Sequence, residues 1–298
     1  MKRISIGSWA YTIGPYAEHP VPWTEVLDKL AALGFQGVEL GGFPPHPNPN
    51  DLPTKEQREE VVRQLKERNL GCSGLAADLW SQKLINTDDP GPYIAEFQKN
   101  VDFCRDLGID TIRVDTVQPP SILEEVHPIT GRDRVVHTWR ECSERAAAAG
   151  VRVVWEFEPG FAFNKPSDIE RILDQVASDN FSVMFDTCHA HMVAAVGARQ
   201  PGEKETLPGG ALELAQRLRG RIGHVHLIDS DGTLHDDETS THAPIGEGLL
   251  DFDALIPELN QSGVPHDWWT IDLCFWPDAW AVTEQCKRAV DVLNEKYG

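Results

Sequence analysis

The chain has 298 residues, 41% of them hydrophobic, and carries 27 basic against 47 acidic side chains, a formal net charge of −20. This length and hydrophobic content suit one large α/β domain, and no linker-like stretch divides the chain, so we expect a single domain over residues 1–298. The charge argues against a nucleic-acid or anionic-membrane partner, which requires a basic face, and no apolar run reaches the roughly 20 residues of a membrane span.

The N-terminal residues MKRISIGSWAY lead directly into a strand-like pattern, without the apolar region of a signal peptide. Six cysteines are scattered along the chain without CxxC spacing, which is typical of reduced thiols rather than of a disulfide framework. We therefore expect a cytoplasmic protein.

Eight strand-like runs follow one another along the chain. They are Arg3–Trp9, Gly37–Leu40, Gly71–Asp78, Thr111–Asp115, Val151–Glu158, Phe181–Asp186, Ile222–Asp229 and Trp268–Leu273. Helical patterns, with apolar residues at i, i+3 and i+4 spacing, alternate with these runs. They are Trp23–Leu33, Lys55–Leu70, Tyr93–Leu107, Arg134–Ala149, Ser167–Val176, Ala211–Leu218, Phe252–Leu259 and Ala279–Tyr297. Eight βα units in this length predict a single (β/α)8 TIM barrel.

A weak internal repeat supports the barrel. The segments LAALGFQGVEL, CRDLGIDTIRV and AAAAGVRVVWE each join a helix end, a glycine and a strand. The competing architecture, a doubly wound open sheet, usually carries a GxGxxG phosphate loop after its first strand, and GSWAYTIGP does not match that pattern.

Functional residues of a TIM barrel stand at the C-terminal ends of its strands. Read in chain order, those ends are Trp9, Glu39, Asp78, Asp115, Glu156 with Glu158, Asp186, His226 and Asp272. So many acids in one barrel mouth would repel one another unless a cation neutralised them. The pattern therefore predicts a divalent metal site.

Some of these positions have two readings. Glu156 and Glu158 point to the same face of their strand, so one can be a ligand and the other a buried, paired acid. An isolated aspartate at the position of Asp186 would be a helix N-cap. His224 and His226 also share a face, and because His226 is nearer the mouth, we expect His224 to be a core histidine that holds neighbouring acids.

With these residues placed, the chain resembles the xylose isomerase-like barrel superfamily, in particular its sugar (phosphate) isomerase/epimerase branch. The resemblance extends over essentially the whole chain. The motifs that carry it are GVEL (37–40), WEFEPG (155–160), FDTCH (185–189), HVHLID (224–229) and PIGEG (244–248).

The resemblance implies that Glu156, Asp186, His226 and Asp272 are metal ligands. The fourth ligand of the family is usually a glutamate, so the shorter Asp272 departs from the pattern and binds the metal either directly or through a water. Oxygen-rich ligands with one imidazole suit Mn²⁺, the ion that we expect, with Mg²⁺, Co²⁺ and Zn²⁺ as alternatives.

The resemblance also implies substrate contacts. His189 matches the substrate-binding histidine and would hold the oxygen of the reacting carbon. Glu39 is expected to orient either the substrate or a ligand histidine, and Trp9 either stacks on a sugar face or packs in the core.

Two further side chains are expected at the site. Glu158 either binds substrate or pairs with Arg113 or Lys165, and Arg113 is itself a candidate substrate-binding residue. The segment from Asp229 to Gly248 is expected to be a long irregular loop that covers the site. Its histidines receive no role.

A divalent ion on a carbonyl and its neighbouring hydroxyl would stabilise an enediolate, with Glu156 and Asp272 as the acid/base pair. The resemblance thus implies an isomerase or epimerase of an unphosphorylated sugar or keto-sugar. The alternative is a lyase or dehydratase acting on an inosose or a 3-keto-glycoside, including a C-glycoside deglycosidase subunit. A non-catalytic sugar-binding protein and an endonuclease IV-like nuclease are further alternatives. We expect a homo-oligomer, and a small partner subunit in the deglycosidase case.

Overall fold

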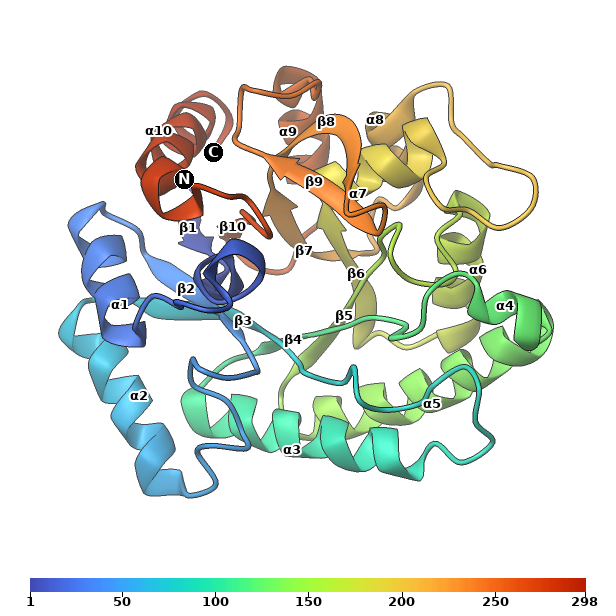
Figure 1. Ribbon diagram of the computed structural model, residues 1–298, viewed down its shortest axis with the longest axis horizontal. Coiled ribbons are helices and arrows are strands. Elements are labelled where there is room, and N and C mark those ends of the chain that lie inside the picture. Colours follow the sequence, from blue (N-terminus) through green and yellow to red (C-terminus); the bar gives the residue numbers. More distant parts are fainter.

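Eight parallel strands form the central barrel of the computed structural model, which describes residues 1–298 (Figure 1). They are β1 (Arg3–Ile6), β2 (Gly37–Gly41), β3 (Gly71–Ala76), β4 (Thr111–Val114), β5 (Arg152–Glu156), β6 (Phe181–Asp186), β7 (Ile222–Leu227) and β10 (Trp268–Ile271). Each pairs with its neighbours in chain order, and a parallel bridge between Gly7 and Glu39 joins β1 to β2. The predicted (β/α)8 barrel is confirmed.

Helices surround the strands (Figure 1). The eight predicted ones correspond to α1 (Trp23–Ala32), α2 (Lys55–Glu67), α3 (Gly91–Leu107), α5 (Pro128–Ala148), α6 (Pro166–Val176), α8 (Gly210–Arg217), α9 (Phe252–Gln261) and α10 (Ala279–Tyr297). Two short helices, α4 (Ile122–Glu125) and α7 (Thr187–His191), were not predicted. None of the helices is both long and apolar enough to span a bilayer.

Helix α5 begins at Pro128 rather than at the predicted Arg134. Proline suits the first position of a helix because its fixed φ is helical and its missing N–H would have no partner there. The His127 ring accepts a hydrogen bond from the Ile129 N–H and so caps this earlier start.

The core between strands and helices is aromatic behind β5 and β6. Trp139 of α5 packs against Trp155 of β5 and Phe181 of β6, with ring centroids 5.2 and 5.3 Å apart. Its indole N–H donates to the Tyr93 hydroxyl at 3.1 Å, so the one polar atom of the ring is satisfied. This packing holds in place the two strands that end in Glu156 and Asp186.

The segment from Asp229 to Gly248 is not the irregular loop that we predicted. It forms an antiparallel hairpin of β8 (Asp229–His235) and β9 (Thr239–Ala243), which lies against α7 (Figure 1). At its base, the Asp229 carboxylate accepts hydrogen bonds from the backbone N–H groups of Gly246, Gly248 and Leu250, each at 3.0 Å. The hairpin is therefore anchored at its base by these hydrogen bonds, and its side chains face the barrel mouth.

Candidate metal centre and catalytic cavity

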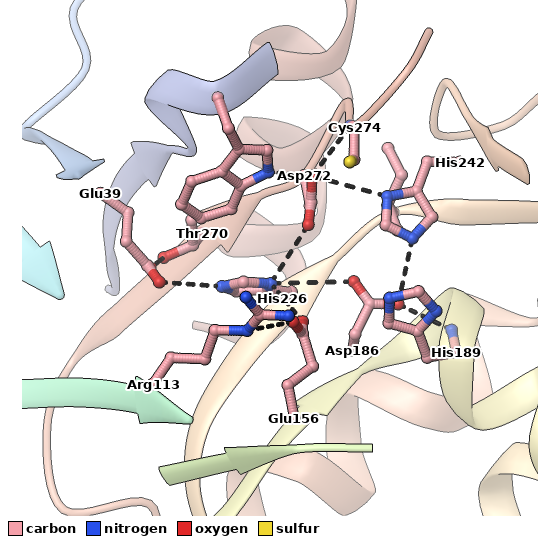
Figure 2. A network of polar contacts seen from close by, with 12 residues as sticks. Glu39, Arg113, Glu156, Asp186, His189, His226, His242, Thr270, Asp272 and Cys274 are labelled. Carbon is pink, nitrogen blue, oxygen red and sulfur yellow. Dashed lines mark hydrogen bonds and ion pairs between the residues drawn. The ribbon is translucent and has the colours of Figure 1, made fainter. Parts of the chain in front are cut away.

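Four buried side chains converge at the C-terminal end of the barrel (Figure 2). Glu156 ends β5, Asp186 ends β6, His226 lies in β7 and Asp272 follows β10. One ligand atom from each lies within 4.8 Å of the others. The His226 Nδ1 atom is 3.2 Å from Glu156 Oε1, 3.4 Å from Asp272 Oδ2 and 3.9 Å from Asp186 Oδ2. These are the four residues that the sequence comparison with the family implies as ligands.

The residues present fit a divalent cation. Glu156 Oε1, Asp186 Oδ2 and His226 Nδ1 are buried without a hydrogen-bond partner, although an unpaired buried polar atom costs about 1–3 kcal/mol. Ligand atoms about 2.1 Å from one ion lie about 3–3.5 Å apart, which is close to the spacings in this cluster. Three carboxylates with one imidazole suit Mn²⁺, Mg²⁺, Co²⁺ or Zn²⁺.

The two oxygens of Asp186 have different surroundings. Oδ1 accepts a hydrogen bond from the His189 backbone N–H at 2.7 Å and so caps the N-terminus of α7. Oδ2 has no such partner and faces the cluster. Asp186 can therefore cap α7 with one carboxylate oxygen and bind a metal with the other.

Asp272, which is shorter than the glutamate usual in the family, is likewise anchored through only one of its carboxylate oxygens. Its Oδ1 accepts hydrogen bonds from the Trp9 indole N–H at 2.8 Å and from the Cys274 backbone N–H at 2.9 Å. These two donors turn Oδ2 toward His226 (Figure 2). Direct ligation by Asp272 therefore needs no rearrangement of its neighbours. Trp9 contributes a donor here as well as an aromatic face to the cavity.

Glu39 lies on the Nε2 side of the His226 ring, opposite the Nδ1 atom that faces the cluster. Its Oε1 atom is 3.2 Å from His226 Nε2, and its Oε2 atom is 2.7 Å from His224 Nε2 and 2.9 Å from Thr270 Oγ1. With a proton on Nε2 toward Glu39, the Nδ1 lone pair would be free for a metal. Glu39 is fully buried and does not line the cavity, so its substrate-binding role is not supported. Its position matches the alternative role of orienting a ligand histidine.

Replacing Glu39 with glutamine is expected to weaken divalent-metal affinity about 10–100-fold, because the amide no longer fixes the tautomer and basicity of His226. Calorimetric titration of the metal-free protein measures this change. Glu258→Gln is the matched control, since Glu258 is a buried carboxylate paired with Arg219 far from the cluster. Equal affinity in both variants would contradict the orienting role.

A cavity of about 450 Å³ opens above the cluster. Its polar lining includes Arg113, Glu158, His189, Thr239 and His242, and its aromatic lining consists of Trp9, Phe43, Trp80, Phe161 and Phe275. Asp78 does not line it.

Arg113 does not pair with Glu158. Its guanidinium is 2.6 Å from Glu156 Oε2 and 3.4 Å from Asp115 Oδ2. Lys165 donates to the Glu203 carbonyl instead. Arg113 therefore neutralises one oxygen of a candidate ligand, and Glu158 has no cationic partner.

Glu158, two residues beyond the end of β5, faces His189 of α7. Glu158 Oε2 accepts a hydrogen bond from the Thr239 hydroxyl and lies 3.5 Å from His189 Nε2. His189 Nδ1 is 2.8 Å from the Ser240 hydroxyl. Burial and the nearby Glu156 carboxylate raise the pKa of Glu158 to about 7, while burial lowers the pKa of His189 to about 3. The pair thus offers an exchangeable proton beside a neutral imidazole.

His242 of β9 is a site residue that was not predicted from the sequence. Its ring is buried, with Nδ1 3.5 Å and Nε2 3.9 Å from carboxylate oxygens of Asp272 and Asp186, respectively. Neither nitrogen has a hydrogen-bond partner. The signal was the period-two pattern in TSTHA, which places Ser240 and His242 on the same face of a strand.

The potential at this cluster is strongly negative. Burial alone would lower the pKa of both buried histidines. Glu39 and the cluster carboxylates nevertheless raise the pKa of His226 well above its ordinary value, and Asp272 and Asp186 raise the pKa of His242 to about 9. A divalent cation would supply positive charge to balance these carboxylates.

Comparisons with known proteins agree with this fold. The family model described as xylose isomerase-like TIM barrel matches residues 27–295. An inosose dehydratase of Lacticaseibacillus casei is 22% identical over 284 residues, covering 88% of this chain and 85% of that protein. A D-tagatose 3-epimerase-like protein superposes with a TM-score of 0.74 at 19% identity, covering 100% of both chains. The IolI protein with a bound zinc atom superposes with a TM-score of 0.73 at 18% identity, covering 100% of this chain and 99% of that one. At these identities, the structural likenesses establish the fold alone.

Proposed function

The chain belongs to the xylose isomerase-like TIM barrel family, and on this premise we propose that it is a divalent-metal-dependent lyase that dehydrates a cyclic polyhydroxy-ketone of the inosose class. The observation that carries the proposal is the convergence of three carboxylates and one imidazole beneath a cavity. The similarity to an inosose dehydratase favours elimination over the isomerase that the sequence suggested first. Isomerisation or epimerisation of an unphosphorylated keto-sugar is the second candidate, supported by the likeness to a D-tagatose 3-epimerase-like protein.

Both reactions begin with loss of a proton from the carbon beside a carbonyl. A cation held by Glu156, Asp186, His226 and Asp272 would supply Lewis-acid stabilisation of the negative charge on oxygen. We assign proton removal to Asp272, whose Oδ2 faces the cluster while Oδ1 is anchored. Glu156 is the other carboxylate of the predicted acid/base pair, but Arg113 holds its Oε2 at 2.6 Å.

The reactions differ in what the second group must do. Elimination needs an acid that protonates the leaving hydroxyl, and Glu158 lines the cavity without belonging to the cluster of four. The α-proton passes to Asp272, the C–O bond breaks with its electron pair on oxygen, and Glu158 donates the proton that completes water. His189 is placed to hold a substrate hydroxyl through Nε2. The net change is the loss of one water.

Incubation of the metal-loaded protein with an inosose and with keto-hexoses in D₂O tests the proposal, with NMR spectra recorded after the metal has been removed by a chelator. Elimination is expected to remove the carbinol signals of two adjacent carbons, because the α-carbon becomes an enol or carbonyl and the β-carbon loses its hydroxyl, and to produce an unsaturated or dicarbonyl ring. Deuterated sugars that keep all their hydroxyls would instead establish the isomerase. No change in either class of substrate would refute both functions.

Sugar phosphates are expected to compete no better than the corresponding free keto-sugars. Arg113 is already paired with Glu156 and Asp115, and the strongly acidic chain repels a dianion. Inhibition constants for a keto-hexose and its phosphate, measured side by side, check this expectation. Markedly tighter inhibition by the phosphate would show it to be wrong.

A further inference from the structure

The cavity has two chemically different parts. One part is polar and carries the candidate ligands Glu156 and Asp272 together with Arg113, Glu158, His189 and His242. The other part is aromatic and apolar, and consists of Trp9, Ile13, Phe43, Trp80, Pro119, Phe161 and Phe275. Further polar side chains, Arg199, His235, Asp236, Glu238 and Thr239, also line the cavity. The volume of about 450 Å³ falls within the range of about 300–1,000 Å³ that is typical of drug-sized ligands. A single polyol ring fills only part of it.

Two aromatic pairs give this apolar part a fixed shape. Phe43 and Trp80 lie with ring centroids 5.4 Å apart, and Phe275 stacks on His235 at 4.7 Å with an interplanar angle of 11°. The Trp80 indole N–H donates to Asp115 at 3.0 Å, which fixes the plane of the ring. Although 43% of Trp80 is exposed, the ring is thus held at the cavity wall by a specific hydrogen bond.

The backbone at Phe275 is unusual for such a large side chain. Its φ is +60°, a left-handed conformation that costs a non-glycine residue on the order of 1 kcal/mol. Gly14 provides the room for the ring, since a Cβ atom there would lie 2.6 Å from Phe275 Cδ1. Two local features therefore combine to place this aromatic ring at the cavity wall.

Aromatic side chains bind flat apolar groups by area burial and ring stacking. We propose that the apolar part of the cavity is a subsite for a planar aryl group, and that the substrate class is a cyclic polyhydroxy-ketone with an aryloxy group on the carbon β to the carbonyl, as in an aryl 3-keto-glycoside. This inference rests on the proposed lyase function and replaces the leaving hydroxyl with an aryloxy group.

Asp272 and Glu158, the residues assigned to the dehydration, also account for the protons of this reaction. Asp272 takes the proton from the carbon between the carbonyl and the aryloxy-bearing carbon. The C–O bond to the aryl group breaks, and its electron pair stays on the aryl oxygen. Glu158 protonates that oxygen, so the products are an unsaturated keto-sugar and a phenol. No oxidant or reductant is consumed, because the substrate already carries the carbonyl.

Turnover of three substrates by the metal-loaded protein tests the inference: an inosose, methyl 3-keto-β-D-glucopyranoside and the phenyl analogue. Because phenol is intrinsically the better leaving group, the decisive quantity is the change in the phenyl-to-methyl ratio of kcat/KM on mutation. Trp80→Ala and Phe275→Ala are each expected to lower this ratio at least tenfold, mainly through a higher KM for the phenyl substrate. Circular dichroism and metal content verify that the variants are folded.

Trp23→Ala is the matched control, since Trp23 is a partly buried ring of α1 outside the cavity, and it should leave the ratio unchanged. An unaltered ratio in both cavity variants would overturn the aryl subsite while leaving the lyase intact. Turnover of the inosose without turnover of the phenyl substrate would overturn it too. Failure of all three substrates would instead refute the lyase proposal on which the inference rests.

Discussion

The His226→Ala variant is expected to lose its bound divalent metal and, with it, all turnover. His226 is the one imidazole among the four candidate ligands, and its Nδ1 atom lies 3.2–3.9 Å from a carboxylate oxygen of each of the other three. Removal of a group that merely orients a ligand costs about 10–100-fold in metal affinity. Removal of the ligand itself should therefore cost more than about 100-fold.

Elemental analysis after mild purification measures this effect as ions per chain. The wild type should carry one ion, and His226→Ala and Asp186→Ala should carry almost none. His191→Ala is the control, because His191 lies at the end of α7 and belongs to none of the clusters that could hold a metal. Equal metal content in the wild type and both ligand variants would exclude this assignment of the metal site.

That these four side chains meet in the barrel mouth could be predicted from chain order, whereas their selection as candidate ligands came from the family resemblance. In a parallel barrel, every strand delivers its C-terminal residue to the same mouth. A carboxylate at the end of β5 or β6 must therefore approach a histidine in β7, whatever the details of packing. The same rule does not say which oxygen of Asp186 caps α7 and which one faces the cluster, since that depends on the turn that follows the strand.

The hairpin could not be predicted from local pattern. Its strands lack the apolar alternation of a half-buried sheet, because their inward side chains contact a polar cavity rather than a core. Ser240 and His242 meet His189, Asp186 and Asp272 instead. The base of the hairpin is fixed by Asp229 through backbone donors further along the chain, and sequence spacing does not reveal such bonds.

The partner of Arg113 was also out of reach of sequence reasoning. Arg113 and Glu156 lie on adjacent strands β4 and β5, whose register pairs Arg113 with Val154. From that register, a long guanidinium side chain can reach either Glu156 at the end of β5 or Glu158 two residues further on. The structure selects Glu156 at 2.6 Å. Glu158 therefore lacks a cation and remains available as the acid of the proposed elimination.

The Asp272→Asn variant is expected to retain weakened metal binding and to lose proton exchange. The amide keeps the volume of the carboxylate but removes its charge and its ability to accept a proton. The donors at Oδ1, from Trp9 and Cys274, would select the amide oxygen and leave the NH₂ group toward the cluster. An NH₂ group is not a ligand, so the metal would be held by the three remaining side chains.

At saturating metal, loss of the general base should slow the incorporation of solvent deuterium into the substrate by about 10²–10⁴-fold. Mass spectrometry of the recovered substrate measures this rate separately from elimination. Asp272→Glu is the informative companion, because it restores a carboxylate of the length usual in the family and should keep measurable exchange. If Asp272→Asn incorporates deuterium at nearly the wild-type rate, Asp272 is not the base, and the role passes to Glu158 or His189, which face each other across the same cavity.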